Sequence, residues 1–127
     1  MFTELYIPHA TPEQAGWFND MQRLSASPSN AVRLQHIFAT IDVRSSLPHV
    51  TVPTLILHSR GDQAIPASQG QALADAIPGA TFELLDSDNH LLLDTEPAWP
   101  HFIKRVRDFL EHDRPDPDPI VQRIPVA

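Results

Sequence analysis

Two kinds of apolar pattern alternate along the chain. Apolar residues recur every three or four positions over residues 11–24, 27–40, 66–77 and 97–111, which is typical of amphipathic helices. Two short apolar runs, 52–58 and 80–85, have the length and character of strands buried in a parallel sheet. No element is predicted for residues 1–10. The pattern as a whole predicts an α/β fold.

Proline and hydroxyl residues mark where these helices begin. Thr11-Pro12, followed by Gln14, has the form of a capping box, and Ser27-Pro28 opens the second helix in the same way. Pro66 and Pro97 stand at the expected starts of the third and fourth helices.

The first two and the last of these helices each carry an apolar face. We expect these faces to pack into the core, and the alternative for the first two helices is that they line a ligand pocket. The first helix presents Trp17, Phe18, Met21 and Leu24, and the second presents Ala31, Leu34, Ile37 or Phe38, and Ile41. The last helix presents Trp99, Phe102, Ile103, Val106, Phe109 and Leu110.

The order strand, helix, strand over residues 52–90 predicts a βαβ unit. Because adjacent parallel strands end at the same edge of a sheet, the loops 58–66 and 86–96 should be neighbours. That arrangement would bring Asp62 and His90 together. A carboxylate beside a histidine can fix the imidazole tautomer and leave the other nitrogen as a general base. Without further context, a surface turn at Asp62 and a loop histidine at His90 are the simpler interpretation of the two residues.

The composition of the chain limits the kinds of binding partner and the cellular compartment that we expect. The 127 residues suffice for one domain at most, and the net charge of -7, with the nine basic residues scattered, argues against a nucleic-acid partner. The chain has no cysteine. It also has neither a signal-peptide pattern nor an apolar run long enough for a bilayer, so we expect a cytoplasmic protein without membrane contact.

A metal site is the alternative interpretation of the second loop. Asp86, Asp88 and His90 have ligand-type side chains, and a site of two carboxylates and one histidine remains open. A calcium loop is excluded, because Leu91 replaces the required glycine and Pro97 the required glutamate. We predict no cofactor, and we expect His58 to hold the loop that carries Asp62.

Two segments, VPTLILHSRGDQAIP and ATFELLDSDNHLLLDTEPAWPHF, resemble the C-terminal part of the α/β-hydrolase fold family. The resemblance implies that Asp62, four residues before Pro66, is the triad acid and that His90 is the triad histidine. Ser59 departs from the glycine that is usual at the start of the acid loop. The segments NHLLLDTEPAW and FNDMQRLSASPSNAVRL look most similar to hydrolase-like domains fused to LuxR-type regulators or adenylate cyclases in bacteria.

The resemblance covers residues 1–111. It implies an incomplete α/β-hydrolase fold, with the last two parallel strands and flanking helices. Residues 1–45 would be cap-derived helices, 46–111 a βαβα core and 112–127 a tail rich in proline and aspartate.

The family's nucleophile motif, Gly-x-Ser-x-Gly, does not occur, because the only glycines are Gly16, Gly61, Gly70 and Gly79. A truncated gene, an expressed fragment and a degenerate paralogue all fit this pattern. We therefore expect the C-terminal part of an esterase-like domain, inactive alone, that would take a small ester-like ligand. The alternative is a non-catalytic sensory or protein-interaction module.

A sheet without its neighbouring strand should expose an edge near 52–58 and leave one sheet face uncovered. Such an edge favours association with a second copy of the chain.

Overall fold

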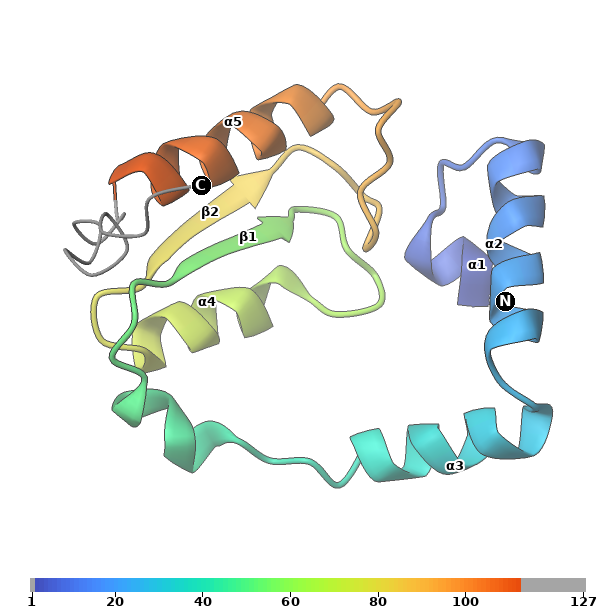
Figure 1. The fold of residues 1–127 in the computed structure, drawn as a ribbon, viewed down its shortest axis with the longest axis horizontal. Coiled ribbons are helices and arrows are strands. Elements are labelled where there is room, and N and C mark those ends of the chain that lie inside the picture. Colours follow the sequence, from blue (N-terminus) through green and yellow to red (C-terminus); the bar gives the residue numbers. More distant parts are fainter. Residues whose placement is uncertain (1, 113–127) are drawn as a thin grey trace, which may run out of the picture.

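The computed structural model describes residues 2–112 (Figure 1). The chain forms α1 (Phe2–Tyr6), α2 (Pro12–Ser25), α3 (Pro28–Phe38), a 3₁₀ helix η1 (Arg44–His49), β1 (Leu55–Ser59), α4 (Ala67–Ala76), β2 (Thr81–Leu85) and α5 (Trp99–His112). The predicted tail lies outside the described residues except for His112, which ends α5. The boundary expected after residue 45 stays a prediction.

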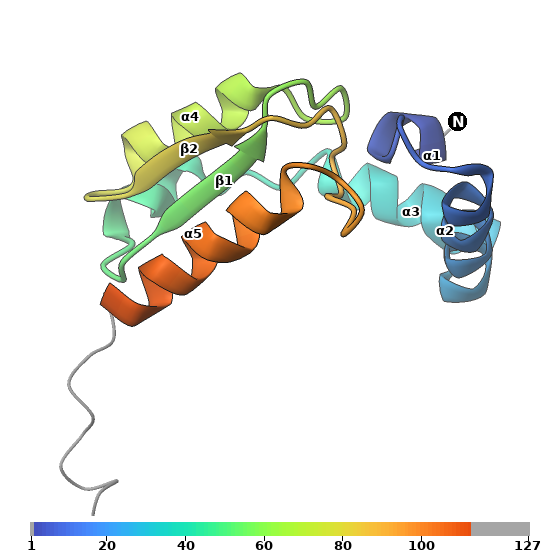
Figure 2. The same cartoon turned by 90° about the horizontal axis from the view of Figure 1, so that it is seen from above.

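The strands β1 and β2 are parallel neighbours, with Leu55 opposite Thr81 and Ser59 opposite Leu85. The crossover between them is α4, which lies on one face of the sheet, while α5 lies on the other (Figures 1 and 2). This arrangement confirms the α/β class. The expectation that one sheet face would be uncovered is wrong, because α5 folds back along that face. Within residues 2–112, the edge of β1 that faces away from β2 has no strand partner.

Two of the predicted helix starts have the expected caps. The Thr11 side chain accepts a hydrogen bond from the Gln14 amide, and the Gln14 side chain accepts one from the Thr11 amide, which completes a capping box. Ser27 accepts from the Asn30 amide in the same way. Pro66 and Pro97 lie just before their helices rather than at the first position, since α4 begins at Ala67 and α5 at Trp99.

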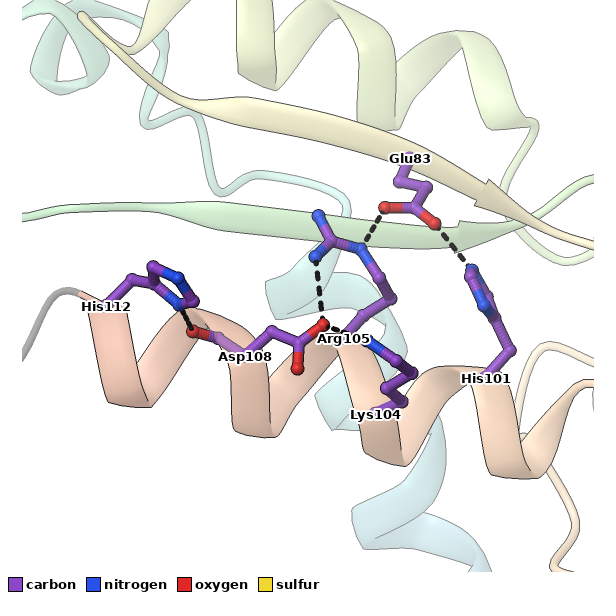
Figure 3. Close-up of polar contacts among 6 residues, drawn as sticks. All are labelled: Glu83, His101, Lys104, Arg105, Asp108 and His112. Carbon is purple, nitrogen blue, oxygen red and sulfur yellow. Dashed lines mark hydrogen bonds and ion pairs between the residues drawn. The ribbon is translucent and has the colours of Figure 1, made fainter.

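A cluster of charged side chains joins α5 to β2 (Figure 3). Glu83 on β2 accepts a hydrogen bond from His101 at 2.5 Å and pairs with Arg105. Arg105 lies 3.8 Å from Asp108, which also pairs with Lys104. The Arg105 guanidinium holds the pKa of Glu83 below its ordinary value. Ion pairs as exposed as these contribute little to stability, because solvent screens them. Their main effect is to fix the direction of α5 across the sheet.

The apolar faces of α2 and α3 are largely exposed, so the prediction that they pack into a core is wrong. Trp17 is 66% exposed, Leu24 89% and Phe38 58%, and α3 buries no residue. Phe18 is the only buried residue on these two helices, and α2 packs against α1. The stripe on α5 is half-covered rather than buried, and Leu110 is 60% exposed.

The buried apolar residues are few, and all but Phe18 lie at or next to the end of a helix or strand. They are Ile7, Phe18, Ile77, Leu85 and Ala98. Within the described part of the chain, none of the helices has the length and apolar character needed to cross a membrane.

Candidate active site

The loops that follow β1 and β2 stay in contact beyond the strands. The Arg60 amide donates to the Leu85 carbonyl at 2.9 Å, and the Gly61 amide donates to the Ser87 carbonyl at 3.0 Å. Gly61 permits this approach, because a Cβ atom there would lie 1.8 Å from Oδ1 of Asp88. The two loops are therefore neighbours.

Asp62 and His90 meet between these loops. Nδ1 of His90 lies 2.7 Å from Oδ2 of Asp62. An ionised carboxylate only accepts hydrogen bonds, so Nδ1 carries the proton and Nε2 of the neutral ring is an acceptor. The Asp62 side chain is 3% exposed and that of His90 is 23% exposed. The carboxylate is thus enclosed, while the imidazole keeps access to a ligand. The catalytic roles of the two residues stay a prediction.

Three hydrogen bonds hold the Asp62 carboxylate. Oδ1 accepts from the amides of Ala64 and Ile65 at 2.8 and 3.0 Å. Oδ2 lies 3.3 Å from Nε2 of His58, in addition to its contact with His90. Nε2 of His58 also donates to the Ile65 carbonyl at 2.9 Å. A carboxylate offers about four lone-pair sites, so these contacts leave Asp62 little freedom to rotate.

The hydrogen bonds keep Asp62 ionised. Burial acts to raise the pKa of this carboxyl, but the Ile65 amide, the His90 ring and the Ala64 amide together outweigh it. The pKa of Asp62 is consequently lowered from its ordinary value. Near neutral pH the site therefore holds a negative charge next to Nδ1 of His90.

A cavity of about 390 Å³ opens beside this pair, at the carboxyl end of β1. Its volume falls in the range of about 300–1,000 Å³ that small-molecule sites occupy. The polar part of its lining is His58, Ser59, Asp62 and His90, and the apolar part is Leu57, Leu85, Leu91, Leu92, Trp99 and Phe102. The cavity combines an apolar wall with an acid–base pair.

The structure does not support the metal alternative. Asp88 pairs with His9 at 2.9 Å, whereas His90 pairs with Asp62, so two of the three proposed ligands point to different partners. Over residues 2–112, no group of three or more His, Asp or Glu side chains could hold a metal ion.

Two residues near His90 were not predicted. The Tyr6 ring lies edge-on to the His90 ring, with centroids 4.8 Å apart and an interplanar angle of 82°. Asn89 is fully buried, and its Oδ1 accepts from the His9 amide at 3.2 Å. The sequence held no signal for either contact, because residues 1–10 have no periodic pattern.

Similarity to known proteins extends over part of the chain. No protein-family profile matches it. Over 81 residues, it is 37% identical to the putative carbamate hydrolase RutD of Pseudomonas savastanoi pv. phaseolicola, covering 64% of this chain and 30% of that protein. Over 75 residues, it is 31% identical to the pimeloyl-[acyl-carrier protein] methyl ester esterase of Vibrio vulnificus strain YJ016, covering 59% of this chain and 29% of that protein.

Both of these relatives are α/β-hydrolases, and so the matched part of the chain is homologous to that family. The resemblance found in the sequence is confirmed for this part. The match spans about 30% of the length of the relatives.

Proposed function

We propose that this chain supplies the acid and the base of an esterase-like hydrolase site. The observation that carries the proposal is the 2.7 Å contact between Nδ1 of His90 and Asp62, next to a cavity with an apolar wall. In this proposal His90 is the general base and Asp62 orients it. Homology of the matched part to two hydrolases supports the same reaction class.

The proposed reaction needs a hydroxyl group close to Nε2 of His90. Nε2 removes the hydroxyl proton while the hydroxyl oxygen attacks the carbonyl carbon of the substrate, and Asp62 stabilises the imidazolium that forms. The imidazolium then returns the proton to the leaving group as the tetrahedral intermediate collapses. Because the sequence has no Gly-x-Ser-x-Gly motif, we propose that the nucleophile comes from residues outside this sequence and that the chain alone is inactive.

We propose a small ester or carbamate as the substrate. The two relatives are a putative carbamate hydrolase and a methyl ester esterase, and both kinds of bond have a carbonyl carbon with a heteroatom leaving group. The apolar wall of the cavity, including Trp99 and Phe102, favours a substrate with an apolar portion.

The test combines the chain alone with a chimaera. In the chimaera, residues 1–112 of this chain replace the homologous part of the Pseudomonas savastanoi relative, and hydrolysis of a p-nitrophenyl ester is followed by absorbance. We expect the chimaera to be active and the activity to fall about 10²–10⁴-fold in His90→Ala, the range that a general base contributes. His36→Ala, which removes an exposed histidine on α3, is the matched control and should leave the rate unchanged.

The chain alone should hydrolyse the ester no faster than its His90→Ala variant. Faster hydrolysis by the wild-type chain would contradict the proposed inactivity. Full chimaera activity in His90→Ala would contradict the role of the histidine.

The unpaired edge of β1 favours a second candidate function, a non-catalytic module that binds protein through this edge. In this proposal, residues 52–58 associate with a second copy of the chain. Val52, three residues before β1, is 64% exposed, so Val52→Lys places a charge beside the start of the strand and should shift the protein to monomers in light scattering at micromolar concentration. Val32→Lys, at a residue 58% exposed on α3, is the matched control. A wild-type chain that is monomeric under these conditions would exclude the second candidate.

A further inference from the structure

Asp62 and Tyr6, which contact the ring of His90, come from two distant parts of the chain. Asp62 holds one ring nitrogen, and Tyr6 of α1 lies against the ring itself. We propose that Tyr6 is a positioning residue for His90, so that the docking of residues 2–25 on the 86–96 loop sets the direction in which Nε2 points. The inference rests on the proposed function, because it concerns the same histidine.

The contact with Asp62 does not orient the imidazole completely. A hydrogen bond to Nδ1 fixes the position of that atom, but the ring can still tilt about the bond. Nε2 lies on the far side of the ring, so a small tilt moves it by a larger distance. A general base needs a defined position relative to the hydroxyl that it deprotonates. A second contact with the ring would remove this remaining freedom.

Tyr6 makes such a contact in two ways. Its ring meets that of His90 edge-on, at an interplanar angle of 82°, a favoured geometry for aromatic pairs. Its carbonyl accepts a hydrogen bond at 3.1 Å from the amide of Leu91, the residue after His90. One residue therefore restrains both the imidazole and the backbone that carries it.

Tyr6 is itself held by the packing of α1 against α2. The five residues of α1 are too few for an independently stable helix. The Tyr6 ring centroid lies 6.3 Å from that of the buried Phe18, and the Thr3 hydroxyl bonds to Asn19 and Gln22 of α2. The position of Tyr6 thus depends on α2 as a whole.

Further polar contacts attach the same helical unit to the loop that carries His90. Besides the Asn89 contact, Nε2 of His9 lies 2.9 Å from Asp88, and the Gln14 side chain donates to Thr95 at 3.1 Å. These contacts converge on residues 88–95, on both sides of His90. Movement of residues 2–25 would therefore be transmitted to the histidine.

The test is the NMR spectrum of the histidine rings in the full 127-residue chain. Tyr6→Leu keeps an apolar side chain of similar size but removes the ring, and Tyr6→Phe keeps the ring. We expect the His90 ring-proton resonances to shift in Tyr6→Leu, because the ring current of the tyrosine is lost, and to return close to wild type in Tyr6→Phe. Trp17→Leu, which removes an exposed aromatic side chain from α2, is the control and should leave His90 unchanged.

The low-field signal of the Nδ1 proton separates this inference from the proposed function. It should persist in Tyr6→Leu, since Asp62 still accepts that proton, and disappear in Asp62→Ala. Unchanged His90 resonances in Tyr6→Leu, or equal shifts in Trp17→Leu, would overturn the positioning role. None of these measurements requires turnover, so an inactive chimaera would remove the proposed function without deciding the role of Tyr6.

Discussion

The two halves of the described chain use similar helical patterns with different results. In residues 46–112, α4 and α5 lie on opposite faces of a two-stranded sheet, and the Asp62–His90 pair lies between the loops that follow its strands. In residues 2–45, α2 and α3 also carry apolar faces, but these remain largely exposed. Apolar periodicity therefore predicts a helix but not its burial, since burial requires a second surface that packs against the apolar face.

The largest expected change in stability is found by truncating one leucine in each half and comparing the two variants. Leu85, at the end of β2, is 4% exposed, and Leu24 on α2 is 89% exposed. Leu85→Ala should lower the free energy of unfolding by about 2–5 kcal/mol, because it leaves a cavity. Leu24→Ala should change it by less than about 0.5 kcal/mol. Urea denaturation followed by circular dichroism measures both. An equal loss in the two variants would mean that the face of α2 is covered in solution.

Two aspartates with lowered pKa values, Asp62 and Asp42, should differ in their contribution to stability. Asp62 is enclosed, whereas Asp42, with a pKa of about 2 because of Arg44, is in the exposed half. Asp62→Asn should cost about 1–3 kcal/mol at pH 7, because it disturbs hydrogen bonds of a buried group.

The contribution of Asp62 to the free energy of unfolding depends on pH, and the lowered pKa of its carboxyl sets the direction. The native state holds Asp62 ionised more readily than the unfolded chain, so its contribution is complete above the unfolded pKa of about 3.9. It is lost as the pH falls below that value through the lowered native pKa. The denaturation midpoint of the wild type should exceed that of Asp62→Asn at pH 7, and the difference should become smaller at pH 4 and smaller again at pH 3. Asp42→Asn should show little advantage to lose, since its ion pair is exposed.

The smallest expected changes in stability come from replacing a glycine in a helix of each half. A Cβ atom at Gly70 of α4 would lie 2.7 Å from Nδ1 of His58 and 2.9 Å from the Phe82 ring, while one at Gly16 of α2 would meet nothing within 4 Å. Gly70→Ala should destabilise the protein by about 1–2 kcal/mol through overpacking. Gly16→Ala should stabilise it by about 0.5–1 kcal/mol through helix propensity. Thermal unfolding of the two variants distinguishes the signs, and stabilisation by Gly70→Ala would show that α4 is loosely packed on β1.

Much of the fold was predictable because its signals are local. The caps at Thr11 and Ser27 and the two strands are marked by neighbouring residues, which dictate them through short-range hydrogen bonds and side-chain pattern. The short elements α1 and η1 were not predicted, since five or six residues carry too little periodicity.

The site was predictable to the same degree. Parallel strands end at one edge, so the approach of Asp62 to His90 follows from the βαβ order. The contact of Tyr6 with His90 does not follow from any such rule, because it depends on how a separate pair of helices packs against a loop.

The separations along the chain also bear on how the protein folds. Asp62 and His90 are 28 residues apart, whereas His9 and Asn89 are 80 apart. Closing the shorter loop costs less conformational entropy, and contacts between nearby residues form sooner on average. The acid and the histidine can therefore come together during the earliest collapse of the chain. The contacts from residues 6–9 would follow later, onto a loop whose partners are already in place.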